Sequence, residues 1–317
     1  MLPAKIILLF ALLGVLPCLA ANNKCSDVFG GESTRNAEER LAAILGTTNE
    51  HFYPKNDYNQ LFAKAITEFE PTPENFREAL DYFLKVRIKI ARGNRNDRDL
   101  LAALKSESAQ KHFLGKSRDM TNVTSIYAES LYGDLSIRYK ELYGLLESRR
   151  REGRFNTPDH NELIIRRNKQ AKDYETKPSP ENSWWLHYED IDGSGTKRLI
   201  SGIIMKTDNV SADGIALYGI YNSFSRDVPK IVKHLERLWK RALIANSQRE
   251  KVAAIAEFEW FFFQSNPLTR AAASIGDVMS LNLQYHLGLP MRTEFKHLDF
   301  YALTMTKDEY IEWRLNQ

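Results

Sequence analysis

Two acidic side chains lie in an otherwise almost wholly apolar stretch, and they are the clearest candidates for proton-transfer chemistry. Glu257 and Glu259 belong to the run AAIAEFEWFFF, whose alanines and phenylalanines leave almost no polar helix face. A carboxylate buried among apolar side chains tends to have a raised pKa, which suits removal of a proton from a hydroxyl group. Glu257 and Glu259 are therefore the candidate catalytic bases.

A second group of residues, directly after this stretch, has the types and spacing of an anion site. Asn266 and Pro267 are a good N-cap and first residue for a new helix, whose free N–H groups and dipole attract a negative charge. Arg270 lies one turn further on, and Ser274 and Asp277 follow on the same helix face. These residues predict a site for phosphate or carboxylate.

The same residues also fit a structural interpretation. Buried arginines are usually paired, so Arg270 can form an ion pair with Asp277 or Glu259 inside a capped core helix. Both interpretations stay open from the sequence.

The order of elements around this junction resembles the helical core of the Fic/Doc/AvrB (Fido) class. The resemblance covers about residues 180 to 317 and rests on an amphipathic helix over Val228 to Leu243, a buried helix, a polar junction and a further apolar helix. The family carries a loop of the form H-P-F-x-[DE]-G-N-G-R-x-x-R at the junction, where this chain reads W-F-F-F-Q-S-N-P-L-T-R-A. Asn266 can correspond to the loop asparagine, and Arg270 can correspond to the anion-binding arginine. The two matches need different alignments of the loop. The base histidine of the family is missing, and Trp260 takes its place if Asn266 sets the register.

The resemblance implies two functions of different classes. One is an enzyme that moves a nucleotide- or sugar-derived group onto a protein side chain, with a nucleotide or nucleotide sugar as substrate and no other cofactor. The other is an effector-type module that binds a protein partner, of the host or the envelope, through its hairpin edge and a basic segment. The missing histidine favours the binding module, because fold alone does not fix function.

The beginning of the chain predicts export. Lys5 precedes the apolar run IILLFALLGVLPCLA, which is too short to span a membrane but typical of a secretory signal peptide with cleavage near Ala20. We therefore divide the chain into a signal peptide (1–21), an N-terminal helical domain (22–150), a basic hinge (151–180) and the C-terminal Fido-like domain (181–317).

Hydrophobic spacing predicts a mainly α protein, a multi-helix bundle around one buried central helix, with a small β-hairpin near 183–205. Further helices are expected over 36–45, 58–69, 73–88 with Thr72 as its N-cap, 97–104, 125–146 and 228–243, and a last one is expected to start at Thr306 with Glu309 in a capping box. Residues 215–221 predict a third strand or a turn.

Charge and composition limit the partners. The net charge is +3, so nothing global calls for nucleic acid, and no apolar run long enough for a membrane span occurs. The basic run Ser148 to Arg154 predicts a solvated hinge or, alternatively, a patch for an anionic partner. The seven histidines are scattered and no metal-ligand spacing occurs.

Overall fold

The structure is a computed structural model of the chain. It describes residues 34–46, 55–93, 123–127, 136–155, 183–205, 210–211, 214–223, 227–268, 271–291 and 297–317. By its internal contacts the chain divides into Met1–Gly31 and a compact unit, Glu32–Gln317, which contains all of these residues. The predicted signal peptide, the expected helix over 97–104 and most of the predicted hinge lie outside the described residues.

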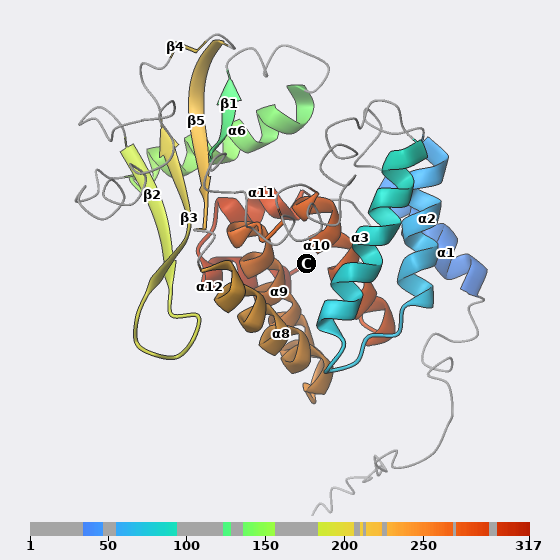
Figure 1. The fold of residues 1–317 in the computed structure, drawn as a ribbon. Helices are drawn as coiled ribbons and strands as arrows, with labels where there is room; N and C mark the ends of the chain where they lie inside the picture. Colours follow the sequence, from blue (N-terminus) through green and yellow to red (C-terminus); the bar gives the residue numbers. More distant parts are fainter. Residues whose placement is uncertain are drawn as a thin grey trace, which may run out of the picture. The chain divides into compact units, whose positions relative to one another are not determined.

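The structure confirms the predicted class: a mainly helical protein with a small antiparallel sheet (Figure 1). The described helices are α1 (Thr34–Gly46), α2 (Lys55–Glu68), α3 (Phe76–Gly93), α6 (Ser136–Arg151), α8 (Val228–Ile244), α9 (Gln248–Ser265), α10 (Ala272–His286), α11 (Leu298–Leu303) and α12 (Lys307–Leu315). None of the helices in the described part of the chain is both long enough and apolar enough to cross a membrane.

The sheet contains the predicted hairpin. Its strands are β1 (Val123–Tyr127), β2 (Ser183–Glu189), β3 (Arg198–Met205), β4 (Val210–Ser211) and β5 (Gly214–Asn222), in the order β1-β5-β3-β2, with β4 beside β5. All pairs are antiparallel, and β2 and β3 form the hairpin, with Leu186 opposite Gly202. The pairing of β2 shifts between His187 and Tyr188, which marks an irregularity near the end of the strand.

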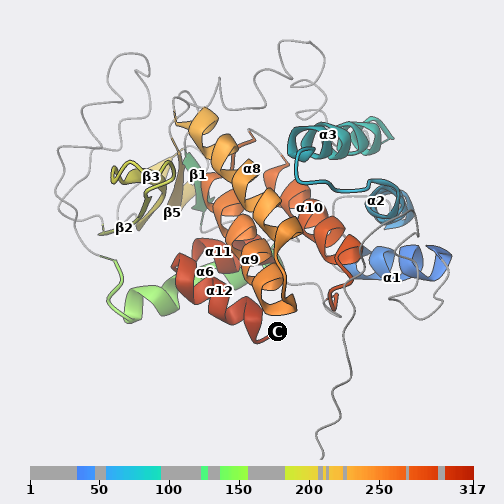
Figure 2. The same ribbon diagram turned by 90° about the horizontal axis from the view of Figure 1, so that it is seen from below.

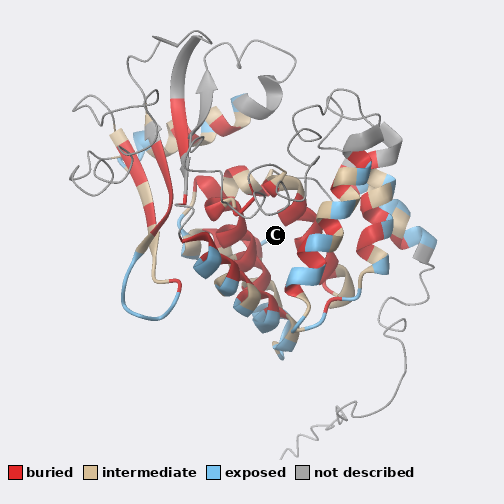
Figure 3. Ribbon diagram, in the orientation of Figure 1, coloured by how far each residue is buried: buried red, intermediate tan, exposed pale blue. Residues whose placement is uncertain are grey.

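Helix α9 is the buried centre that the sequence predicts. It begins with a capping box, in which Ser247 and Glu250 each satisfy a backbone N–H of the other. From Ala254 to Ser265 every residue except Glu257 is buried, and α8, α10, α11, α12 and β3 surround the helix (Figures 2 and 3). A helix with no polar face is stable in water only when its neighbours cover it on all sides.

Helix α10 approaches α9 closely at Gly276. A Cβ atom at this position would lie 2.6 Å from the ring of Phe263 and 2.9 Å from the ring of Phe262. Glycine is thus required here for helix packing, although its backbone is ordinary helix.

A second apolar cluster joins the sheet to helices α6 and α11. Leu142 and Leu146 of α6 pack with Trp185, Tyr218 and Ile220 of the sheet and with Phe300 and Leu303 of α11. The Tyr218 hydroxyl donates to the Glu147 carboxylate on α6. One face of the sheet is therefore covered by helices rather than by solvent.

Two sequence-based element assignments are wrong. Residues 123–127 form strand β1, and the helix expected over 125–146 starts at Ser136. The segment VTSIY is rich in β-branched and aromatic residues, and pairing with β5 outweighs its weak helical spacing. Helix α3 starts at Phe76, and Thr72 to Asn75 form a turn in which the Thr72 N–H donates to Asn75 Oδ1 at 2.8 Å.

Candidate functional site

Glu259, one of the two candidate bases, lies in a fully satisfied buried ion pair. Its carboxylate accepts from Arg314 Nε at 2.8 Å and Nη2 at 3.1 Å, from the Tyr310 hydroxyl at 3.1 Å, and from the Ser280 hydroxyl. Glu259 has an exposed fraction of 0%, and the Arg314 side chain one of 8%. This carboxylate has four side-chain donors and no solvent access. It therefore has a structural role and cannot reach a substrate.

The neighbours of this pair extend the buried polar cluster. The Ser280 hydroxyl also accepts from Gln284 Nε2 at 2.8 Å, one turn further along α10. Burial alone would lower the pKa of Arg314, but attraction to Glu259 outweighs it, and Tyr310 and Asp277 act in the same direction, so the pKa is raised. The guanidinium of the last helix is thus held charged inside the core.

Glu257, the other candidate base, faces the opposite way on α9. It is half-buried and forms an ion pair with Arg241 of α8. The two carboxylates are therefore not brought together, and each is engaged by a different arginine on a different helix.

Asn266 ends one helix and does not start the next, so the N-cap prediction is wrong. Its backbone is in the left-handed region (φ 43°), and its N–H donates to Phe262 O as the C-cap of α9. Asparagine is one of the few residues that adopt this conformation at low cost. Helix α10 begins only at Ala272, with Ala271 (φ 63°) as its N-cap residue, so Pro267 is not its first residue.

Replacing Asn266 by aspartate separates these two roles. An N-cap accepts aspartate as well as asparagine. A C-cap does not, because the new charge meets the negative end of the helix dipole, at a cost of about 0.3–1 kcal/mol. We expect Asn266→Asp to lower the melting temperature at pH 7 and Asn266→Gly to leave it nearly unchanged; an aspartate variant as stable as the wild type would contradict the C-cap assignment.

The remaining predicted anion ligands do not converge in the described residues. The Ser274 hydroxyl donates to Ala271 O at 3.0 Å, within the first turn of α10. Asp277 is 8% exposed and lies near Arg314. Arg270 lies outside the described residues, so its role stays a prediction.

Trp260, which the resemblance aligns with a base histidine when Asn266 sets the register, is a core residue. It is 1% exposed, and its indole N–H donates to Met305 O at 3.0 Å, just before α12. Gln264, one turn later, donates to Ala302 O at 2.6 Å and accepts from the Ser201 hydroxyl of β3. The polar atoms of α9 thus hold α11, α12 and the sheet in place.

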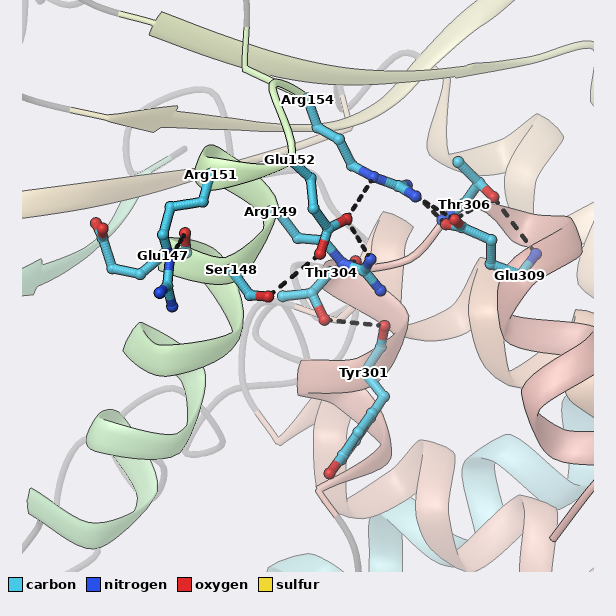
Figure 4. A network of polar contacts seen from close by, with 10 residues as sticks. All are labelled: Glu147, Ser148, Arg149, Arg151, Glu152, Arg154, Tyr301, Thr304, Thr306 and Glu309. Carbon is cyan, nitrogen blue, oxygen red and sulfur yellow. Dashed lines mark hydrogen bonds and ion pairs between the residues drawn. The ribbon is translucent and has the colours of Figure 1, made fainter.

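The basic run at the end of α6 is exposed over 150–153, and two of its arginines contact the rest of the protein. Arg149 Nε donates to Thr304 O at 2.6 Å, at the end of α11 (Figure 4). Arg154 donates through both terminal nitrogens to Glu309, with 2.8 Å between Nη1 and Oε2. Glu309 is also the capping-box residue of α12, as predicted, and accepts from the Thr306 N–H at 2.9 Å.

Acidic side chains pair with three of the four arginines of this run. Besides Arg149 and Arg154, Arg150 pairs with Glu147 at 2.9 Å, and Glu152 accepts from Arg149 at 2.8 Å and from Arg154 at 3.1 Å. The pKa of Glu309 falls to about 2, mainly because Arg154 hydrogen-bonds to its charged form. Arg151 is exposed and donates to the Glu147 backbone carbonyl at 3.3 Å, so the patch for an anionic partner stays a prediction.

Arg314, Tyr310 and Ser280 are partners of Glu259 that the sequence did not predict. A glutamate within an apolar run indicates a buried carboxylate that needs a cation, and Arg314 is one of only three arginines after Glu259. The sequence contains no signal that selects Arg314, because it is 55 residues away along the chain.

No protein-family model matches the chain, and no curated protein matches its sequence. Among the described residues, no three histidine, cysteine or acidic side chains are grouped so as to hold a metal ion.

Proposed function

We propose that this chain is an exported, effector-type protein that binds a protein partner by adding an extended segment of the partner to the β2 edge of its sheet. In this proposal, residues 181–317 are a degenerate Fido-like domain that keeps the helical arrangement without the chemistry. The apolar leader over residues 1–21 supports the export component.

The observation that carries the proposal against an enzyme is the environment of Glu259. It is fully buried and accepts from four side-chain groups, Glu257 is paired with Arg241, and Trp260 is a core residue. A general base must reach the proton that it removes, and none of these groups offers such access. For this reason we do not advance the transferase alternative.

Strand β2 has the properties of a binding edge. In the described sheet it pairs with β3 on one side only, and it contains neither the proline nor the lysine that usually protect an edge strand from further pairing. Trp184, Trp185 and His187 are buried, so the strand is anchored from Ser183 to His187, before the irregularity. Partner strands bind such edges through main-chain hydrogen bonds.

Proline substitution tests this edge, because backbone N–H groups along an antiparallel strand point alternately to the neighbouring strand and outward. Ser183 and Leu186 have opposite parity, so one of the two N–H groups points outward. We expect Ser183→Pro or Leu186→Pro, whichever keeps the wild-type melting temperature, to abolish partner binding, while threonine at the same position preserves it.

The probe is an extended peptide selected from a random 12-residue display library on the full-length protein, with affinity measured by fluorescence anisotropy. Equal affinity of the stable proline variant and its threonine control would contradict binding at this edge. A rise in melting temperature with millimolar nucleotide or nucleotide sugar, lost in Glu257→Gln or Glu259→Gln, would instead favour the transferase.

A further inference from the structure

His187 is a buried imidazole at the meeting point of the sheet and four helical segments. It lies on β2, is 6% exposed, and its ring centre is 4.6 Å from that of Trp185 and 5.8 Å from that of Trp260. The imidazole hydrogen-bonds to the backbone of Leu303 at the end of α11. Its Nε2 atom is buried and has no hydrogen-bond partner among the described residues.

Charged groups of opposite sign act on this ring from two elements. Glu309 of α12 favours the imidazolium form, and Arg154, which follows α6, opposes it. The other elements packed here present uncharged groups: Ser201 of β3 lies opposite His187, and α9 presents Trp260. The Arg154 guanidinium also lies 5.7 Å from the centre of the Trp185 ring, so the imidazole and the Arg154–Glu309 pair share one aromatic neighbour.

A proton on Nε2 would add a charged donor that has no acceptor inside an apolar site. It would also lie near the Arg154 guanidinium and attract Glu309 away from it. Protonation of His187 therefore weakens most directly the Arg154–Glu309 pair, which joins the end of α6 to the first turn of α12.

We propose that His187 is an acid-sensitive switch: when it takes up a proton, the Arg154–Glu309 contact opens and the end of α6 separates from the first turn of α12, while α8, α9, α10 and the Arg314 end of α12 stay packed. His187 lies on the same strand as the proposed binding edge, but the switch does not depend on the binding function proposed above.

The pH range follows from the shifted groups. Burial lowers the pKa of His187 from 6.5 to about 4, so the open form takes up a proton at a higher pH than the closed form. Closure is thus fully favoured above pH 6.5 and is progressively lost as the pH falls towards 4. Over this range Glu309 stays charged, because its pKa is about 2.

His234 of α8 provides a matched control. Burial, followed by Arg237, lowers its pKa to about 4, and its Nε2 atom also lacks a hydrogen-bond partner among the described residues. It contacts Phe261 and Arg237, and neither Arg154 nor Glu309 is among the charges that act on it.

The test is hydrogen exchange of the full chain at pH 7.5 and 4.5, corrected for the intrinsic pH dependence of exchange. In the wild type we expect opening of 142–154 and 303–309 to increase about tenfold or more at pH 4.5, relative to α8, α9 and α10. His187→Gln should lose this pH dependence, and His234→Gln should keep it.

Equal pH dependence in wild type and His187→Gln would overturn the switch, and so would an equal loss of protection throughout α8, α9 and α10. If His187→Gln does not fold, NMR titration of the wild-type His187 ring takes its place. Its midpoint must lie below pH 5 and coincide with the opening; an ordinary midpoint near pH 6.5 would equally overturn the proposal.

Discussion

Replacing Arg314 by alanine is expected to lower the free energy of unfolding by about 3–5 kcal/mol, because it leaves the Glu259 carboxylate buried without its cation. The Tyr310 and Ser280 hydroxyls remain as donors, but neither supplies a compensating charge. Chemical denaturation at pH 7 measures the loss.

A double variant separates an ion pair from a simple packing defect. Apolar residues of similar volume replace buried ion pairs at little cost, so Glu259→Leu combined with Arg314→Met should recover most of the lost stability. Arg35→Ala, which removes an exposed pair with Glu39, is the control and should leave the melting temperature nearly unchanged. A double variant no more stable than Arg314→Ala would contradict the structural role of the pair.

Truncation of Trp239 is expected to have a similarly large effect. This α8 residue is 0% exposed, its ring centre lies 6.0 Å from those of Phe76 and Phe258, and its indole N–H donates to Thr72 O at 2.8 Å. Trp239→Ala should therefore lower the free energy of unfolding by about 3–5 kcal/mol through the cavity and the lost hydrogen bond.

Trp239→Phe serves as the matched control, because it keeps an aromatic ring and loses the hydrogen bond. It should cost clearly less than the alanine variant in the same denaturant titration. A loss below about 1 kcal/mol in Trp239→Ala would show that the turn before α3 does not pack on α8 as described.

Local sequence patterns were sufficient to predict most helices and strands of the fold. The run around Phe258 to Phe263 leaves no polar face, and this alone predicts a buried central helix. The hairpin follows from two apolar strands around the glycine-rich segment Asp190 to Gly195, and the capping box at Thr306 and Glu309 follows from four residues.

Long-range contacts decided the features that the sequence did not reveal. VTSIY becomes strand β1 because β5 offers it a partner some 90 residues later. Arg314 and Glu259 form the pair that the sequence analysis placed on Arg270, since a buried carboxylate indicates that it needs a cation but not which one. Asn266 and Pro267 match the start of a helix, yet the left-handed backbone at Asn266 ends α9 and delays α10 to Ala272.

The edge of β2 is the centre of the functional account, and hydrogen exchange with the selected peptide bound tests it most directly. We predict that saturating peptide slows the exchange of backbone amides in Ser183–His187 and leaves the α9–α10 junction, from Gln264 to Asp277, unchanged. Slower exchange confined to that junction, with β2 unaffected, would contradict binding at the β2 edge and would place the binding site at the central helices.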